Sequence, residues 1–347
     1  MNKTVFNILD FGAVGNGFTD CTKQIQRALD CASECRGKVI VPPGRYKVGK
    51  LKPGEGVLLE GSAAWSFRDY GASVFELCDE TVDCMLDITN AFGCCIRAMS
   101  LNGNNLGKGI HGVLLSRTEY NGGGKEDTPC IEDCRIGNFS GDGVRLDKIW
   151  CFSVRHSMLC FNEGSGLYID GWDGFILDNW FSANKDGGIK SENVAASLTI
   201  TGNRVEWNEN FGFSFCKGDS YNITGNFFDR SFGPALVLGK NKDKKVHTVT
   251  VTGNVFRRSG AQENNKRKHL SSHIYLRNCE NTVVLGNSFR GGKNDDGKGK
   301  YSPDYGIVAE NMTACIIKDN VLKDGFAVKD IEMIQDSSGS IVEENIG

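Results

Sequence analysis

Proline is scarce in this sequence of 347 residues, which contains only 6 prolines and no proline-rich stretch that would separate two domains. Long apolar runs are absent as well, and no segment reaches the roughly 18 apolar residues of a membrane-spanning helix. The N-terminal stretch MNKTVFNILDFG lacks the apolar centre of a secretion signal. We therefore expect a cytoplasmic protein with no membrane partner.

Strong positive charge and metal-binding spacings are also missing. The net charge of −3 argues against a nucleic-acid partner, and the one concentrated basic run, NNKRKH at 264–269, is interpreted as a solvated loop. The 14 cysteines form no CxxC pair, so Cys94, Cys95, Cys130 and Cys134 are expected to be packed thiols in a reducing compartment. Because the 5 histidines show no ligand spacing either, the sequence predicts no metal site and no cofactor.

Glycine, by contrast, is abundant at 44 residues, and a Gly-Asn pair recurs in similar surroundings. The corner asparagines are 23 to 33 residues apart, and the extra length above a base period near 23 is held in polar inserts at 240–246, 261–272 and 292–304. Inserts confined to one phase of a repeat are typical of a solenoid. The recurring stretches are LTITGNRVEW (198–207), YNITGNFFDR (221–230), VTVTGNVFRR (249–258) and VVLGNSFR (283–290).

Each repeat also contains three short stretches in which apolar and polar residues alternate, such as GFSFC (212–216), YNIT (221–224) and FFDR (227–230). Alternation predicts strands with one buried face. The sequence therefore predicts an all-β fold, a single-stranded right-handed parallel β-helix with three short strands per coil. The Gly-Asn pair would mark the same corner of successive coils, where the asparagine is expected to adopt the left-handed conformation and to hydrogen-bond its neighbour.

The N-terminal residues predict a cap for this solenoid. Residues 19–37 begin with a capping Thr or Asp and carry apolar residues at helical spacing. Such a helix would cover the open end of the stacked strands, and a strand, a turn and a strand should follow over 37–51. We predict one domain over 1–347, with the cap and first strands in 1–51 and the coils in 52–347. The helical apolar positions are Ile25, Ala28, Leu29 and Ala32.

The stretch NILDFGAVGNGFTDCTKQIQRALD, followed by GKVIVPPGRYKV, closely resembles the N-terminal signature of the pectate-lyase-like superfamily. This superfamily includes polygalacturonase-type glycosidases, epimerases and bacteriophage tailspike depolymerases. The resemblance implies a β-helix that acts on a glycan. The NTD, GDD, GHG and RIK motifs of polygalacturonases are absent, and SGDG at 140–143 matches them only in part. This argues against pectin hydrolysis by the polygalacturonase mechanism.

A second resemblance is to the inulin fructotransferases and difructose-anhydride hydrolases. It is carried by DGGIKSENVAASLTITGN (186–203), GNVFRRSG (253–260) and YGIVAENMTACIIKDN (305–320). Enzymes of that family form trimers with sites between subunits, so this resemblance implies a homotrimer.

Alternation places a carboxylate at the same outward position of three successive coils. In GVRLD (143–147), GLYID (166–170) and GIKSE (188–192) this position holds Asp147, Asp170 and Glu192. Since parallel strands lie about 4.8 Å apart, neighbouring carboxylates should be about 5 Å apart, the spacing of a retaining glycosidase. Like charges this close cannot all ionise easily, so one carboxyl is expected to have a raised pKa and to act as a general acid.

Asp170 and Glu192 are the predicted catalytic pair, with Asp147 and Asp186 in reserve. Basic side chains beside this column would keep the carboxylates ionised or orient a sugar, and aromatic rings would stack on sugar rings. The competing interpretation is structural, because outward charges often only solvate a sheet and aspartates often form turns. The predicted substrate-binding residues are Arg145, Tyr168, Trp172, Asp173, Lys190 and Trp207.

These residues favour an enzyme that cleaves glycosidic bonds of an oligo- or polysaccharide, either a glycoside hydrolase or an intramolecular glycosyl transferase, with fructans among the implied substrates. One alternative is a polysaccharide lyase acting on a uronate-containing glycan, in which the acids would bind Ca²⁺ and a base such as Lys190 would take the α-proton. Another is a non-catalytic glycan-binding or structural β-helix. The outward apolar residues Leu114, Val237 and Val308 hint at self-association.

Overall fold

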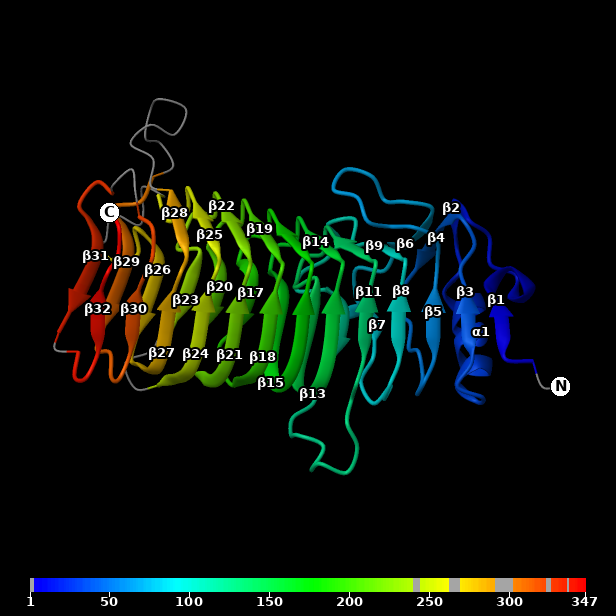
Figure 1. Cartoon of the computed structure of the whole chain (residues 1–347). Helices are drawn as coiled ribbons and strands as arrows, with labels where there is room; N and C mark the ends of the chain where they lie inside the picture. Colours follow the sequence, from blue (N-terminus) through cyan, green and yellow to red (C-terminus); the bar gives the residue numbers. More distant parts are fainter. Residues whose placement is uncertain (1–2, 240–243, 262–268, 291–301, 323–325, 336) are drawn as a thin grey trace. The chain divides into compact units, whose positions relative to one another are not determined.

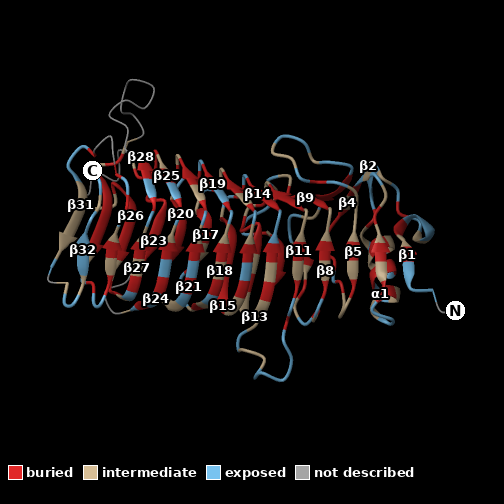
Figure 2. Ribbon diagram, in the orientation of Figure 1, coloured by how far each residue is buried: buried red, intermediate tan, exposed pale blue. Residues whose placement is uncertain are grey.

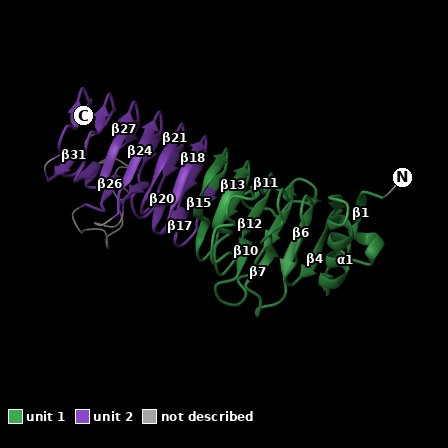
Figure 3. Cartoon of the chain, turned by 90° about the horizontal axis from the view of Figure 1, so that it is seen from below, with its two compact units in different colours: residues 1–180 green, residues 181–347 purple. Residues whose placement is uncertain are grey.

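The computed structural model describes residues 3–239, 244–261, 269–290, 302–322, 326–335 and 337–347. Most of the three predicted polar inserts, and the basic run up to residue 268, lie outside the described residues. The chain forms two compact units, Met1–Trp180 and Phe181–Gly347 (Figure 3). That these units make one domain stays a prediction.

Both units consist of short parallel strands wound as a right-handed β-helix with three strands per coil, which confirms the predicted fold class. We call the three strand positions of a coil strip one, strip two and strip three. Each strand pairs with the strand of the same strip one coil further on, and Figure 1 shows the strip-two arrows pointing in one direction within each unit.

In unit 1 two long strands, β13 (Val144–Arg155) and β15 (Ser165–Leu177), serve both strip one and strip two. Strip one also contains β7 (Cys84–Asp87) and β10 (His111–Leu115). Strip two also contains β1 (Val5–Asn7), β3 (Lys38–Ile40), β5 (Leu58–Glu60), β8 (Cys95–Arg97) and β11 (Cys130–Glu132). Strip three contains β2 (Asn16–Asp20), β4 (Gly44–Val48), β6 (Ser73–Leu77), β9 (Ser100–Asn102), β12 (Arg135–Gly137) and β14 (Met158–Cys160).

In unit 2 the three strips are separate, and β16 (Trp180–Ser182) spans the boundary in the chain. Strip one contains β17 (Gly187–Ser191), β20 (Phe211–Phe215), β23 (Leu236–Leu238), β26 (Ser272–Arg277), β29 (Tyr305–Glu310) and β31 (Lys329–Ile334). Strip two contains β18 (Ala195–Thr201), β21 (Gly218–Thr224), β24 (Val246–Thr252), β27 (Cys279–Leu285), β30 (Ile316–Lys318) and β32 (Ile341–Glu343). Strip three contains β19 (Arg204–Glu206), β22 (Phe227–Asp229), β25 (Val255–Arg257) and β28 (Ser288–Arg290).

The core of each unit lies inside the coils. Along β18, β21 and β24 buried residues alternate with more exposed ones, visible as red bands in Figure 2. Inward residues of equivalent position stack from coil to coil, as Phe228, Phe256 and Phe289 do with ring centroids 4.8 Å apart. The two-residue period of the sequence therefore sets which side chains reach the outer face.

The corner asparagines of unit 2 form the predicted ladder of hydrogen bonds. The Oδ1 atom of Asn226 accepts from the backbone N–H and the Nδ2 of Asn203 at 3.0 and 2.9 Å. The same pattern continues through Asn254, Asn287, Asn320 and Asn345. The prediction that the corner asparagine adopts the left-handed conformation was wrong. The glycine before it does so instead, with φ 64° at Gly225. Glycine has no Cβ and takes this conformation without strain.

The predicted cap is present as α1 (Thr22–Ser33), whose buried residues are the four predicted apolar positions. Together with the short 3₁₀-helix η1 (Ile8–Phe11), α1 packs at the N-terminal end of unit 1 against β1 and β3 (Figure 1). The predicted capping Thr or Asp was wrong, since Cys21 is the N-cap and makes no side-chain capping bond. Asp20 instead accepts a hydrogen bond from the Thr22 N–H at 2.9 Å.

The outward apolar residues do not form an exposed surface, so they no longer support self-association, which stays a prediction. Leu114, Val237 and Val308 are all buried, and Val237 and Val308 belong to a cluster with Phe211, Tyr275 and Tyr305. Among the described residues, no helix is long and apolar enough to cross a membrane.

Candidate functional site

Strip one of unit 1 carries charged side chains on its outer face because β13 and β15 alternate as predicted. Val144 and Leu146 are fully buried inside the coil, so Arg145 and Asp147 point outward. Asp147 pairs in register with Asp170 on the next coil, which confirms two rungs of the predicted carboxylate column. Paired parallel strands place these two residues about 4.8 Å apart.

Lys148 interrupts the alternation and brings a cation to the same face. The pairing of β13 with β15 shifts register between Asp147 and Ile149, so Lys148 is an extra residue in a β-bulge, with φ 62°. Its Nζ lies 2.5 Å from Oδ2 of Asp170. Opposite the bulge is Gly171, where an added Cβ would lie 2.0 Å from the carbonyl oxygen of Ile149. The close approach of the two strands at this bulge therefore requires glycine.

Asp170 is covered, although its strand position faces outward. It is 1% exposed, and the Tyr120 hydroxyl donates a hydrogen bond to its Oδ1 at 2.9 Å. Tyr120 comes from the insert at 116–129 and packs on Trp172 with ring centroids 4.3 Å apart. Burial and the Asp170 charge raise the pKa of Tyr120, so its hydroxyl stays protonated at neutral pH.

Arg145 connects Asp147 to a second carboxylate. Its Nε lies 2.8 Å from Oδ2 of Asp147, its Nη1 lies 3.1 Å from Oδ2 of Asp142, and its guanidinium stacks 3.9 Å from the ring of Tyr168. Burial disfavours the charged guanidinium, but the hydrogen bonds and charges of the two aspartates outweigh this, so the pKa of Arg145 is raised. Tyr168 is buried under this arginine and offers no open ring face to a sugar.

His111 completes this side of the site. Its Nδ1 accepts the backbone N–H of Asp142 at 2.9 Å. Burial lowers the pKa of His111, and the charge of Asp142 only partly offsets this. The imidazole is therefore neutral at neutral pH, with its proton on Nε2. We call the group of His111, Tyr120, Asp142, Arg145, Asp147, Lys148, Asp170 and Trp172 the unit 1 site.

Asp173, a predicted substrate-binding residue, has a structural contact beside the unit 1 site. Its Oδ2 accepts a hydrogen bond from Nε1 of Trp150 at 2.9 Å, and it adopts the left-handed conformation with φ 61°. The backbone N–H of Trp150 is bound in turn by Asp127, which is paired with Arg117 at 2.6 Å. These contacts hold the base of the insert that carries Tyr120.

The other predicted residues lie in unit 2. Lys190 bridges Asp186 and Glu192, with its Nζ 2.6 Å from Oδ2 of Asp186 and 2.9 Å from Oε1 of Glu192. Trp207 is 41% exposed and lies under the guanidinium of Arg230, 4.8 Å from the ring centroid. The predicted pair of Asp170 and Glu192 is divided between the two units, so it stays a prediction.

Lys148, Tyr120 and His111 of the unit 1 site were missed by the sequence analysis, and Asp142 was not among its predicted site residues. Lys148 follows Asp147 in LDKIW, where a second polar residue breaks the alternation, and that break was an available sign of a bulge. Tyr120 lies in the insert SRTEYNGGGKEDTP, whose path over strip one has no periodic signal. His111 was considered only as a metal ligand.

Comparisons with known proteins agree with both resemblances seen in the sequence. A family model described as rhamnogalacturonase A/epimerase, pectate lyase-like, matches residues 5–222. Mannuronan C5-epimerase AlgE3 of Azotobacter vinelandii is 28% identical over an alignment of 193 residues that covers 52% of this chain and 10% of that protein. The chain therefore spans only a small part of the length of this relative.

Two solved structures share the fold. The A-module of Azotobacter vinelandii mannuronan C-5 epimerase AlgE6 matches with a TM-score of 0.65 at 17% identity, covering 98% of this chain and 98% of that chain. DFA-IIIase from Arthrobacter chlorophenolicus A6 matches with a TM-score of 0.64 at 14% identity, covering 98% of this chain and 94% of that chain. At these identities the likeness concerns the fold alone.

Proposed function

Because the chain belongs to the rhamnogalacturonase A/epimerase, pectate lyase-like family, we propose that it is a carbohydrate-active enzyme that works at the unit 1 site. The proposed reaction removes the proton next to the carboxylate of a uronate sugar in an oligo- or polysaccharide. The observation that carries this proposal is the contact of the Tyr120 hydroxyl and the Lys148 ammonium with one buried carboxylate, Asp170. The matched relative is named as a C5-epimerase, which supports a proton-transfer reaction.

Asp170 serves in this proposal as a positioning residue. At 1% exposure it cannot contact a sugar while Tyr120 covers it. It orients Tyr120 and Lys148, which are both partly exposed and can contact a bound glycan.

The accessible charges suit an acidic sugar. Arg145, Lys148 and Asp147 have side chains that are 29%, 25% and 18% exposed, so two cations and one carboxylate are within reach of a bound sugar. Asp142 and Asp170 are nearly buried and bind cations of the protein itself. A uronate carboxylate would therefore bind near Arg145 and Lys148, whose charges oppose the negative charge that develops when the α-proton leaves.

The side chains can be assigned to the proton transfers. Asp147, which is paired with Arg145, accepts the α-proton, and the electron pair of the C–H bond moves into the uronate carboxylate. If Tyr120 then gives its proton to the same carbon from the other face, the sugar is epimerised, and solvent returns the proton from Asp147 to the phenolate. If instead the neighbouring glycosidic C–O bond breaks, the Tyr120 proton goes to the leaving oxygen and an unsaturated sugar remains.

Calcium has no step in this scheme. The sequence-based lyase alternative required the acids to hold Ca²⁺ together, but Asp142, Asp147 and Asp170 each contact a cationic side chain. Within the described part of the chain they do not converge as a ligand group. The donor arrangement therefore does not fit Ca²⁺.

Glycoside cleavage is the second candidate, favoured by the register pairing of Asp147 with Asp170. Their separation of about 5 Å suits retention. This reaction would require the Tyr120 insert to uncover Asp170, and a transferase acting on fructans would belong to the same candidate. This second candidate function would include the predicted catalytic pair of Asp170 and Glu192 and the predicted homotrimer.

The test is a panel of uronans, neutral oligosaccharides and fructans incubated with the protein in D₂O. We expect a uronan to gain deuterium at the α-carbon or to yield ultraviolet-absorbing products. Tyr120→Phe should lower this rate by about 10²- to 10⁴-fold. The matched control is Tyr275→Phe, which removes another tyrosine–carboxylate hydrogen bond, to Glu310, and should keep the parent rate.

Other results would contradict the proposal. New reducing ends without deuterium or ultraviolet absorption would establish hydrolysis instead. Saturable glycan binding with no change in any glycan would support the non-catalytic alternative.

A further inference from the structure

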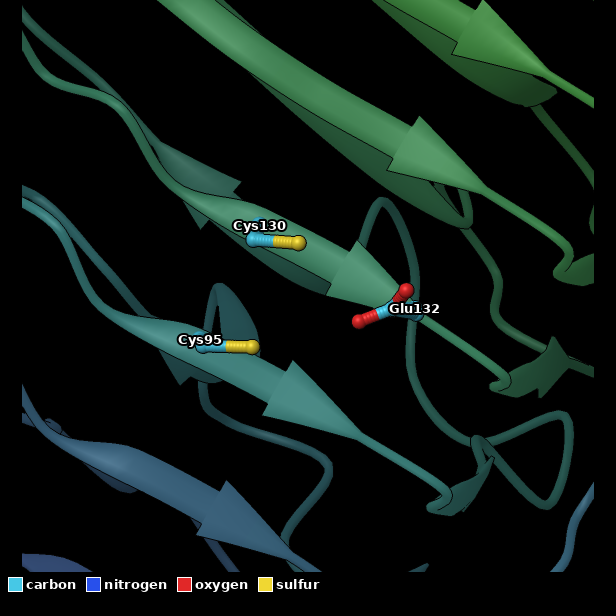
Figure 4. Close-up of side chains that lie close together, drawn as sticks. All are labelled: Cys95, Cys130 and Glu132. Carbon is cyan, nitrogen blue, oxygen red and sulfur yellow. The ribbon is translucent and has the colours of Figure 1, made fainter.

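Cys95 and Cys130 lie side by side on the outer face of strip two in unit 1. They are register partners on β8 and β11, and the buried residues Ile96 and Ile131 that follow them point into the coil. Glu132 comes two residues after Cys130 and so shares its face. Figure 4 shows both sulfur atoms on the same side, with the Glu132 carboxylate beyond the Cys130 sulfur. One ligand atom from each residue lies within 4.8 Å of the others.

We propose that Cys95, Cys130 and Glu132 bind a zinc ion, with water as the fourth ligand. Two thiolates and one carboxylate suit zinc, which binds sulfur and oxygen tetrahedrally, whereas calcium and magnesium require oxygen ligands. A Zn–S bond of about 2.3 Å implies sulfur atoms about 3.8 Å apart. Because the three ligand atoms already lie within 4.8 Å of one another, each pair would have to approach by at most about 1 Å.

The charges around this group are compatible with a metal ion. Two thiolates, a carboxylate and Zn²⁺ sum to −1, and two arginines flank Glu132 in register on the neighbouring coils. Arg155 Nε lies 3.6 Å from Oε1 of Glu132, so its charge offsets part of the negative charge of the group. Arg97 is the partner on the other side and also contacts Glu60.

This zinc site is distinct from the unit 1 site. Cys130 pairs with Ser153 in the second half of β13, whereas Arg145 and Asp147 lie in its first half. Cys130 is also the first residue after the insert that carries Tyr120. A metal ion bound here would link two adjacent coils at the C-terminal end of that insert. We therefore expect it to stabilise the folded protein.

No sequence motif indicates this group, because the two cysteines are far apart in the chain. The predicted packed thiols are correct for Cys94 and Cys134, which are buried. Cys95 and Cys130 are only half-buried, and stacking of the coils brings them together.

The test uses the full chain, kept reduced with a phosphine, and titrates it with Co²⁺ and Zn²⁺. We expect one Co²⁺ to give the near-ultraviolet absorption of thiolate ligands, and Zn²⁺ to displace it and raise the thermal unfolding midpoint. Cys130→Ser should remove the absorption and weaken Zn²⁺ binding at least about tenfold, and Glu132→Gln should weaken binding by a smaller factor. Cys78→Ser, which changes an exposed cysteine elsewhere, is the control and should bind as the parent does.

Two outcomes would overturn the proposal. One is equal Zn²⁺ affinity in the parent and in Cys130→Ser. The other is a pair that forms a disulfide in air and, once reduced, binds no Zn²⁺, in which case the two thiols are a redox pair only.

Discussion

At the scale of single residues, one extra amino acid decides the charge pattern of the unit 1 site. Without the bulge, alternation would turn Lys148 inward after the outward Asp147. The bulge instead holds Lys148 outward at φ 62°, a conformation that is costly for a residue with a Cβ. Its ion pair with Asp170 is a local interaction that offsets this cost.

His273 is a buried histidine whose charge state affects stability. It is fully buried among Phe256, Phe289 and Phe326, and its Nε2 lies 3.2 Å from the carbonyl oxygen of Arg290. Burial lowers its pKa to about 4, although the hydrogen bond to Arg290 acts in the opposite direction. An unfolded histidine has a pKa of about 6.5 and is protonated first as the pH falls.

We therefore predict that His273 makes the protein less stable in acid. Its contribution is fully present above about pH 6.5 and is lost as the pH falls toward 4, by roughly 2 kcal/mol between about pH 7.5 and pH 5. Urea unfolding of the parent and of His273→Phe at both pH values measures the difference. The exposed His247 provides the control His247→Gln, which should keep the parent's pH dependence, and an equal dependence in His273→Phe would refute the prediction.

The residues of the unit 1 site were only partly predictable from the sequence. Alternation alone placed Asp147 and Asp170 on one face, because a two-residue period fixes the side of each side chain. It could not show that Tyr120 would contact Asp170, because the sequence of the insert has no repeating pattern from which its position over the coils could be predicted. The bulge at Lys148 shifts the register by one residue, and the alternation of polar and apolar residues alone does not locate such an extra residue.

At the scale of elements, the corner asparagines hold the coils of unit 2 together. Asn254 is buried, and its Oδ1 accepts hydrogen bonds from the N–H and Nδ2 of Asn226. Its own Nδ2 donates to Asn287 and to the carbonyl oxygen of Ile223. One side chain thereby satisfies polar groups of three successive coils, which no apolar residue could do.

Replacing one rung should be costly. Asn254→Ala would leave the buried backbone N–H of Asn226 without an acceptor and would remove one of the acceptors of its Nδ2, so we expect a loss of about 3 kcal/mol in the free energy of unfolding. Chemical denaturation measures this loss. Asn222→Ala, at an exposed position of β21, is the control with an expected change below about 0.5 kcal/mol. A similar small change for Asn254→Ala would show that the ladder is dispensable.

At the scale of the whole molecule, the N-terminal helix closes the end of unit 1. Leu29 is fully buried in α1, and α1 packs on β1, the first strand of strip two. An uncovered strand edge can pair with another chain. The sequence predicted this helix correctly because its apolar spacing and its position before the first strands both point to the same role.

Leu29→Ala should weaken this cap. Removing a buried leucine side chain typically costs about 2 to 5 kcal/mol, and partial opening of the cap should also increase light scattering on mild heating. Lys23→Ala, at an exposed position of the same helix, should change neither measurement. Lower stability without added scattering would show that α1 supports the fold but does not protect its end.

The asparagine ladder also has a consequence for protein engineering. Consecutive rungs are 23 residues apart at Asn203 and Asn226 and 33 apart at Asn254 and Asn287, yet their N–H···Oδ1 distances are 3.0 and 2.9 Å. The hydrogen bond between neighbouring asparagines therefore keeps its length whether 23 or 33 residues separate them in the chain. A foreign peptide inserted into the chain between two of these asparagines should therefore leave the stacking of the coils unchanged.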